Sequence, residues 1–468
     1  MLLAGEWTSG PSEIPVYNPF DNSVVDTVPR AAAGDVERAL EFAARGAPCM
    51  RRLSGYDRYL RLRRAADLLE ARAEDFARTI TLEEGKILAE SRFEVSRAVA
   101  TLTESAEEAK RLSGEVVPLD GAPGAGNRFG FTIRVPCGVV VAISPFNFPL
   151  NLVAHKVGPA LAAGNSVILK PATDTPLSAL KLCEILLEAG IPAEGLQCLT
   201  GSGGEIGGLL CADPRVRKIT FTGSRDVGEH ICKTAGLKKV TMELGSNSPI
   251  IVLPDADLDK AAAAIASTGF ANAGQVCISA QRILPMKPIY GELLEAVRPR
   301  VEAIATGNPL DASTKMGPMI RESDAARVEE WIREAAGSGA RVVTGGSRRG
   351  ALHEPTVVAD VDPRLRISCD ELFGPAVAFT PVSSADEAIA LANDSPYGLS
   401  AGIFTSSLDA AMRFAREVES GNLHINWGPQ WRADLMPYGG LKESGFGKEG
   451  PRYAVQEMSE LKMVVMHL

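Results

Sequence analysis

Short apolar segments alternate with helix-like segments between residues 138 and 245, and this alternation constrains the fold more than any other feature. The apolar segments, among them GVVVAIS, SVILK and KITFTG, are continuous rather than alternating in polarity. Strands of that kind suit a parallel sheet covered by helices on both faces, because neither face meets water. The sequence therefore predicts a doubly wound α/β domain, whose ligands bind beyond the carboxyl ends of its strands.

A second α/β unit is predicted from 246 to 436. It contains the apolar strand PIIVL, a small-residue helix over DKAAAAIASTGFANAG, and amphipathic helices such as SDAARVEEWIREAAG. Before the first sheet, NPFDNSVVDTVPR predicts a hairpin, and the segment from Gly34 to about Ser113 is helical. An isolated strand is predicted over Arg128–Val135.

The bulk composition excludes several classes of protein. A chain of 468 residues makes two or three domains, and its net charge of −9 argues against a nucleic-acid surface. No apolar run is long enough to span a membrane, and MLLAGEWTSG lacks the features of a signal peptide. The eight scattered cysteines predict neither a disulfide framework nor a metal site, and they suit a reducing cytoplasmic location.

One cysteine stands out by its surroundings, because Cys277 lies at the centre of FANAGQVCISAQR. Alone, such a sulfur is either core filler or a nucleophile. Three other stretches favour the nucleophile, one of them CDELFGP, with an acidic residue and an aromatic in a turn closed by Gly374 and Pro375. Asn147 is held between two prolines in ISPFNFPLN, where its amide is a fixed donor for an oxyanion, and Glu243 ends an apolar strand in VTMELGSNSP, where a carboxylate suits the role of base.

Seven motifs in order make the chain resemble the aldehyde dehydrogenase superfamily nearly end to end: PFNFP, KPA, FTGS, ELG, GQVC, ELFGP and PYGGLKESGFGKEG. The resemblance implies NAD(P)-dependent oxidation of an aldehyde, without metal. Cys277 would attack the aldehyde carbon, the Asn147 amide and the Cys277 N–H would hold the oxyanion, and Glu243 would activate the water that hydrolyses the thioester. A helix N-terminus or the nicotinamide ring would increase the thiolate fraction of Cys277.

The resemblance also assigns cofactor residues, whereas the glycines of GSGGEIGG alone are a weak signal. Ser224 starts a helix facing a pyrophosphate, which Gly223 lets approach. Lys170 would bind the adenosine ribose and Glu371 the nicotinamide ribose. Thr173 stands where NAD-preferring relatives often carry Glu, so both NAD and NADP stay open. The remaining candidates lie beside the same motifs: Ser144, Phe146, Leu244, Gly245 and Phe373.

By resemblance, residues 1–113 and 134–245 form the cofactor domain, and 246–436 form the catalytic domain. Residues 114–133 and 455–468 are the oligomerisation strands of a small β segment, and 437–454 return to the cofactor domain. The implied assembly is a homodimer or homotetramer.

Substrate residues are suggested by the segment NWGPQWRADLMPYGG, which would line the substrate funnel and carries Arg432. Its guanidinium suits a hydroxylated or anionic aldehyde, and the segment resembles the branch that acts on lactaldehyde, phosphonoacetaldehyde and glyceraldehyde phosphate. His155 and Glu449 are further candidates, although a core role for His155 stays open. Val276 stands where some phosphate-handling relatives carry Arg. Two alternatives remain: a CoA-acylating enzyme, which Glu243 disfavours, and a non-catalytic protein on the same fold.

Overall fold

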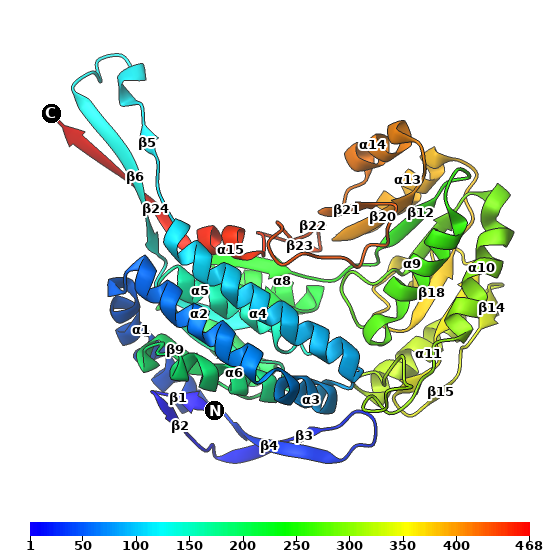
Figure 1. The fold of residues 1–468 in the computed structure, drawn as a ribbon, viewed down its shortest axis with the longest axis horizontal. Coiled ribbons are helices and arrows are strands. Elements are labelled where there is room, and N and C mark those ends of the chain that lie inside the picture. Colours follow the sequence, from blue (N-terminus) through cyan, green and yellow to red (C-terminus); the bar gives the residue numbers. More distant parts are fainter.

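The computed structural model describes all 468 residues and contains two large sheets, each covered by helices (Figure 1). The five central strands of the first sheet are parallel, in the order β9-β8-β7-β10-β11. Chain order therefore reverses between β7 and β10, which is where a doubly wound sheet opens a crevice for a ligand. The strands of this sheet are β1 (Leu2–Leu3), β2 (Glu6–Trp7), β7 (Val139–Ile143), β8 (Ser166–Lys170), β9 (Leu196–Cys198), β10 (Val216–Thr222), β11 (Lys239–Glu243) and β23 (Gly445–Phe446).

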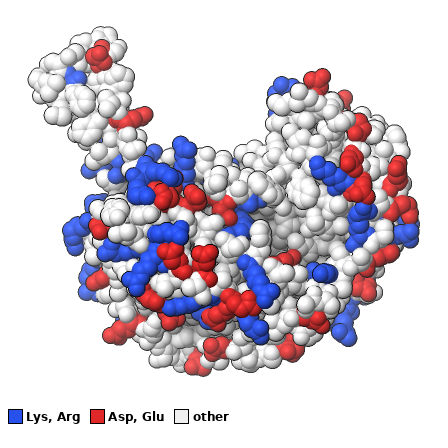
Figure 2. Space-filling view, in the orientation of Figure 1, with Lys and Arg blue, Asp and Glu red and all other residues white.

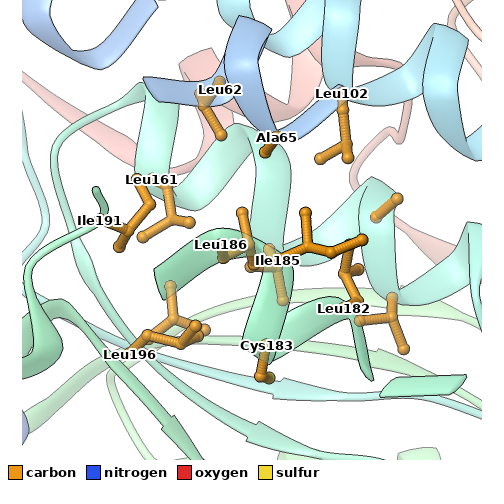
Figure 3. Packing of buried hydrophobic residues seen from close by; sticks show 14 of the residues in the cluster. Leu62, Ala65, Leu102, Leu161, Leu182, Cys183, Ile185, Leu186, Ile191 and Leu196 are labelled. Atoms are coloured by element: carbon orange, nitrogen blue, oxygen red, sulfur yellow. The ribbon is translucent and has the colours of Figure 1, made fainter. Parts of the chain in front are cut away.

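Alternate residues of the central strands enter two different cores. Val140 and Ala142 of β7 pack toward one helical layer, whereas Val139, Val141 and Ile143 pack toward the other. Figure 3 shows the first core, in which Leu62, Leu102 and Leu186 come from three different helices. Its layer consists of α2 (Gly55–Ala71), α3 (Ala73–Glu84), α4 (Leu88–Arg111), α5 (Asn151–Ala162) and α6 (Leu177–Glu188). The opposite layer consists of α1 (Ala33–Arg52), α7 (Gly208–Ala212) and α8 (Arg225–Ala235).

The second sheet has the order β14-β17-β18-β13-β12-β20-β21, and only β14 is antiparallel to its neighbour. Its strands are β12 (Pro249–Val252), β13 (Arg282–Pro285), β14 (Arg341–Thr344), β17 (Thr356–Ala359), β18 (Ala376–Phe379), β20 (Ser400–Phe404) and β21 (Asn422–Ile425). Helices α9 (Leu258–Phe270), α10 (Tyr290–Glu302) and α11 (Glu322–Gly337) cover one face, and α13 (Ala385–Asn393) and α14 (Leu408–Glu417) cover the other. The α/β fold class expected from the sequence is confirmed.

The first sheet with its helices is called the first lobe here, and the second sheet with its helices the second lobe. A three-stranded β arm projects from the first lobe (Figure 1). β24 (Ser459–His467) pairs antiparallel with β6 (Arg128–Pro136) along its full length, and β5 (Val116–Val117) lies on the other side of β6. Charged side chains are sparse on the arm, whereas both signs are mixed over the body (Figure 2). The remaining elements are the hairpin of β3 (Ser12–Tyr17) and β4 (Val24–Arg30), β15 (Arg348–Arg349), β16 (Leu352–His353), β19 (Tyr397–Gly398), β22 (Leu441–Lys442), α12 (Arg366–Cys369) and α15 (Pro451–Glu457).

The helix expected over DKAAAAIASTGFANAG is wrong in its last four residues. α9 ends at Phe270, and Asn272, Ala273 and Gly274 follow with φ of 50°, 52° and 70°. Left-handed backbone is unfavourable for residues with a Cβ, so the contacts around this turn must hold it. None of the helices combines the length and apolar character needed to cross a membrane.

Candidate active site

A cavity of about 340 Å³ lies where the two lobes meet, and both Cys277 and Glu243 line it. The first lobe contributes the end of β11 and parts of α4 and α5, and the second contributes the end of α9 and the Cys277 loop. The wall is completed by the segment that follows β21: Trp427, Gln430, Trp431, Arg432 and Tyr438.

Cys277 lies in an irregular loop with a single side-chain partner. Its Sγ lies 3.2 Å from the hydroxyl oxygen of Tyr438. Burial raises the pKa of the Cys277 thiol to about 12, and the hydrogen bond from Tyr438 opposes that rise. Of the two sources of thiolate stabilisation considered from the sequence, a helix N-terminus is not present at this sulfur, because residues 275–281 form no helix. The thiolate must therefore be stabilised by neighbouring side chains or by a bound ligand.

Asn147 is held by hydrogen bonds of both its side chain and its backbone carbonyl. Its Nδ2 donates to the carbonyl of Gln275 at 2.8 Å, which ties it to the Cys277 loop. Its own carbonyl accepts from Lys86 Nζ at 2.7 Å and from Asn272 Nδ2 at 3.3 Å. Only one of the two amide N–H groups is thereby used, and the backbone N–H of Cys277 donates to no group of the protein. These two free donors suit an oxyanion.

Glu243 ends β11, and both of its carboxylate oxygens are buried without a partner. Burial raises the pKa of Glu243 well above its usual value, and the nearby carboxylate of Glu449 raises it further. A carboxylate without partners in a cavity wall is a polar group that only water or a ligand can satisfy. The side chain is thus suited to bind and deprotonate a water molecule.

Glu449 faces two cations. Lys156 Nζ donates to Glu449 Oε1 at 2.8 Å, and Arg432 Nη1 donates to Oε2 at 3.0 Å. Burial alone would raise the pKa of Glu449, but Lys156 and Arg432 outweigh it and hold the pKa below its usual range. Arg432 also lies over the ring of Tyr438, with 4.0 Å from its guanidinium carbon to the centroid, and its Nε is buried without a partner.

His155 lies behind the cavity wall, bonded on both ring nitrogens. Its Nε2 lies 2.9 Å from Asp434 Oδ1, and Nδ1 lies 3.2 Å from Arg432 Nη2. Burial and then the Arg432 charge lower the pKa of His155 to about 4. Neutral His155 therefore positions Arg432 and Asp434, and its side chain is not among those that line the cavity.

Glu371 and Phe373 lie in a recess beside the cavity, with Gly274 and Val276. Ser246 N–H donates to Glu371 Oε1 at 2.9 Å, which orients the carboxylate, and burial raises the pKa of Glu371 to about 7. A Cβ on Gly245 would overlap Glu371 Oε2, so a larger residue there would displace this carboxylate. The ring of Phe373 meets Phe146 edge-on at 5.9 Å.

The other cofactor candidates lie at the carboxyl ends of strands of the first sheet. Lys170 Nζ is bonded only to the carbonyl of Pro171, and burial lowers its pKa to about 8. Thr173 Oγ1 donates to Gly201 O at 3.1 Å. Ser224 precedes α8 without capping it through its hydroxyl, so the first N–H groups of α8 stay open to an anion.

Two more candidates of this group have packing roles, and a third has an unpartnered hydroxyl. A Cβ on Gly223 would lie 2.5 Å from the ring of Phe221, and Leu244 occupies the space beside Gly228 of α8. The hydroxyl of Ser144 is buried without a partner. Three groups of the site fit a dinucleotide: the oriented carboxylate of Glu371, the uncapped start of α8 after Ser224, and Lys170, which has a single backbone partner.

Tyr438, Gln430, Asp434 and Lys156 were not among the site residues predicted from the sequence. Tyr438 and Asp434 lie in the segment singled out for Arg432, but a contact such as Tyr438–Cys277 joins residues 161 positions apart. Lys156 follows His155 within an apolar helix, and that position was the one available signal, since a lysine buried there needs a counter-charge such as Glu449.

The model of the aldehyde dehydrogenase family matches residues 7–464. The 3-sulfolactaldehyde dehydrogenase of Priestia megaterium is 50% identical over 468 residues, which are 100% of this chain and 98% of that protein. The lactaldehyde dehydrogenase of Methanococcus maripaludis is 38% identical and matched over 100% of both chains.

Two solved structures have nearly the same fold. The glyceraldehyde-3-phosphate dehydrogenase GapN of Methanocaldococcus jannaschii, in complex with NADP, has a TM-score of 0.95 and 36% identity over 98% of this chain and 100% of that one. A betaine aldehyde dehydrogenase of Staphylococcus aureus, in complex with NAD+, has a TM-score of 0.96 and 32% identity over 100% of this chain and 94% of that one.

Proposed function

The chain belongs to the aldehyde dehydrogenase family and oxidises aldehydes with a nicotinamide cofactor, and we propose that Cys277 is its nucleophile and a small hydroxylated or anionic aldehyde its substrate. The observation that carries the proposal is that Cys277 and Glu243 line one cavity, with the Glu243 carboxylate free of partners. We assign the cofactor to a unit of residues 1–113 and 134–245, the nucleophile to a unit of residues 246–436, and the return of the chain to residues 437–454.

The reaction begins with attack of Cys277 Sγ on the aldehyde carbon. The carbonyl oxygen becomes an oxyanion, which accepts hydrogen bonds from the free N–H of the Asn147 amide and from the Cys277 backbone. Loss of one such donor raises the barrier by about 3 kcal/mol in comparable enzymes. Lys170, Glu371 and the first turn of α8 would hold the oxidised nicotinamide cofactor, which would supply the acceptor for the hydride of the aldehyde carbon.

The thioester left on Cys277 is then hydrolysed. Glu243 takes a proton from water, whose oxygen attacks the thioester carbon and releases the carboxylate product and the thiol. A base with a raised pKa suits this step, because it must bind and later return one proton near neutral pH.

Two unpartnered polar atoms of the cavity wall support the proposed substrate class. Arg432 Nε is a charged donor, and Gln430 Oε1 is an acceptor. A donor of this kind suits a sulfonate, carboxylate or phosphate group, and an acceptor suits a hydroxyl. Sulfolactaldehyde and lactaldehyde, named for two relatives, both carry a hydroxyl beside the aldehyde, and the first also carries the anion.

Initial rates with NAD and NADP over sulfolactaldehyde, lactaldehyde, a phosphoaldehyde and propanal test this proposal, with and without CoA. We expect CoA-independent oxidation and the highest kcat/KM for sulfolactaldehyde. Equal kcat/KM for propanal, or a strict need for CoA, would contradict the substrate class or the hydrolytic step respectively. Cys277→Ala should abolish the absorbance rise at 340 nm.

We also propose that the β arm joins subunits. β24 is an edge strand of its sheet, and Leu461, Met463 and Val465 on alternate positions are 53%, 45% and 41% exposed. An exposed apolar edge is a surface that proteins normally cover. Light scattering after size-exclusion chromatography should show a dimer or tetramer, and Val465→Asp should reduce its size, whereas Glu107→Gln on the body should not.

A further inference from the structure

Tyr438 is the one side chain whose hydroxyl reaches the sulfur of Cys277. The two atoms are 3.2 Å apart, and Tyr438 is 3% exposed. No other hydrogen bond of the Tyr438 side chain is present, so this hydroxyl is committed to the sulfur. The strength of this one hydrogen bond therefore depends directly on the charge of the sulfur.

The other charges around Cys277 do not provide a direct partner for a thiolate. Glu371 and Glu243 face it with negative charge and disfavour the thiolate, and Arg432 favours it from a distance. Arg432 is itself engaged by Glu449 and stacks on the ring of Tyr438. The loop around Cys277 offers no helix N-terminus.

We propose that Tyr438 is a catalytic residue that donates a hydrogen bond to the Cys277 thiolate and thereby increases the fraction of reactive sulfur. In the thiol form either atom can be the donor, but only the tyrosine can donate once the sulfur is ionised. A hydrogen bond to a charged acceptor is about twice as strong as a neutral one. The contact therefore favours the thiolate over the thiol.

Tyr438 acts as a donor and not as an acid. Burial raises the pKa of Tyr438 well above its usual value, so the phenol keeps its proton at the pH of the reaction. The Arg432 guanidinium lies over the ring of Tyr438, and this cation–π contact fixes the plane of the ring. No proton passes through the tyrosine, and no bond is formed or broken in it.

The test is the pH dependence of iodoacetamide alkylation of Cys277, followed by mass spectrometry of the Cys277 peptide, because seven other cysteines are free. Tyr438→Phe keeps the ring and removes one oxygen. In this variant we expect alkylation of Cys277 to be about tenfold slower at pH values below the pKa of its thiol, and the apparent pKa of Cys277 to be correspondingly higher. 3-Fluorotyrosine at position 438 is a better donor of nearly the same shape, so it should shift the pKa downward. Tyr453→Phe is the matched control and should titrate as the wild type.

Since the inference rests on Cys277 as the nucleophile, activity is measured on the same alkylated samples. Wild-type enzyme that stays active after complete alkylation of Cys277 would overturn the proposed function. Inactivation of the wild type, together with an unchanged or lower pKa in Tyr438→Phe, would overturn the role of Tyr438 alone. Opposite shifts in the phenylalanine and fluorotyrosine variants support the donor, whereas a purely structural effect would move both in one direction.

Discussion

Asn272 Nδ2 donates a 2.8 Å hydrogen bond to Glu84 Oε1, and this bond joins the left-handed turn before Cys277 to the end of α3 in the other lobe. The backbone N–H of Asn272 also donates to Glu90 Oε1 at 3.0 Å. A buried carboxylate and a partly buried one, both in the first lobe, thus hold the strained backbone that leads to the nucleophile of the second lobe. The position of Cys277 therefore depends on the contact between lobes.

Asn272→Ala removes this anchor. It leaves Glu84 Oε1 without a partner in the interior, although Oε2 still accepts from the Lys86 N–H, and it puts a less tolerant residue at φ 50°. We therefore expect a loss of about 2 kcal/mol and a melting temperature lower by about 2–4 °C. Differential scanning calorimetry measures the shift. Asn22→Ala is the matched control, because Asn22 has φ 58° in an exposed turn without a buried carboxylate. Equal shifts in both variants would show that the Glu84 bond contributes nothing.

The turn at Asn272 could not be predicted from the sequence. The continuous apolar strands and the alternating helices predicted both sheets, since burial on two faces leaves a pattern in neighbouring residues. The helix over DKAAAAIASTGFANAG was extended too far because Ala and Asn are compatible with a helix locally. Glu84 and Glu90 determine the break, and no pattern near Asn272 reveals them.

The sequence motifs predicted part of the candidate site. Cys277, Glu243 and Arg432 do line one cavity, whereas Asn147 and His155 are not among its lining residues, and Asn147 is joined to the Cys277 loop through Gln275. Of the two alternatives for activation of the thiol, the helix N-terminus is ruled out, because residues 275–281 form no helix. Tyr438 and Lys156 act through contacts with residues distant in sequence, which spacing cannot show.

Glu243→Gln should separate oxidation from hydrolysis. The amide cannot take a proton from water, so we expect kcat to fall by about 10²–10⁴-fold while one equivalent of reduced cofactor still forms rapidly. Stopped-flow absorbance at 340 nm gives the burst, and intact-protein mass spectrometry detects the thioester. Glu229→Gln, on the exposed face of α8, is the control and should turn over normally. A variant without a burst would place Glu243 before hydride transfer.

The hydrolytic step should also depend on pH in one direction. Burial and Glu449 raise the pKa of Glu243, so the carboxylate is protonated at pH values where an exposed glutamate is already ionised. We expect the rate of thioester decay to increase with pH through the pKa of Glu243 and then level off. Single-turnover decay measured between pH 5 and 9 tests this, and a rate that falls with increasing pH would contradict the assignment.

Thr173 should influence the choice between NAD and NADP. A neutral side chain there does not repel a ribose 2′-phosphate, whereas a carboxylate accepts hydrogen bonds from the free 2′-hydroxyl. We expect Thr173→Glu to change the ratio of kcat/KM for NADP over NAD by about 10–100-fold toward NAD. Thr173→Gln has the same size without the charge and should change the ratio little. Similar ratios in both variants would show that shape rather than charge decides.

Arg432 should decide between anionic and neutral aldehydes. Its Nε is buried in the cavity wall without a partner, and Glu449 and His155 hold the guanidinium in place. A hydrogen bond from a charged donor contributes about 1.5–3 kcal/mol, so Arg432→Met should lower kcat/KM for sulfolactaldehyde about 10–100-fold more than for propanal. Because propanal reports any general damage to Cys277, the ratio of the two substrates isolates the anion contact. Arg97 lines the same cavity with its guanidinium bound by Asp434, so Arg97→Met should leave the ratio near that of the wild type. Equal losses for both aldehydes in Arg432→Met would assign the arginine to the support of Glu449 and Tyr438 alone.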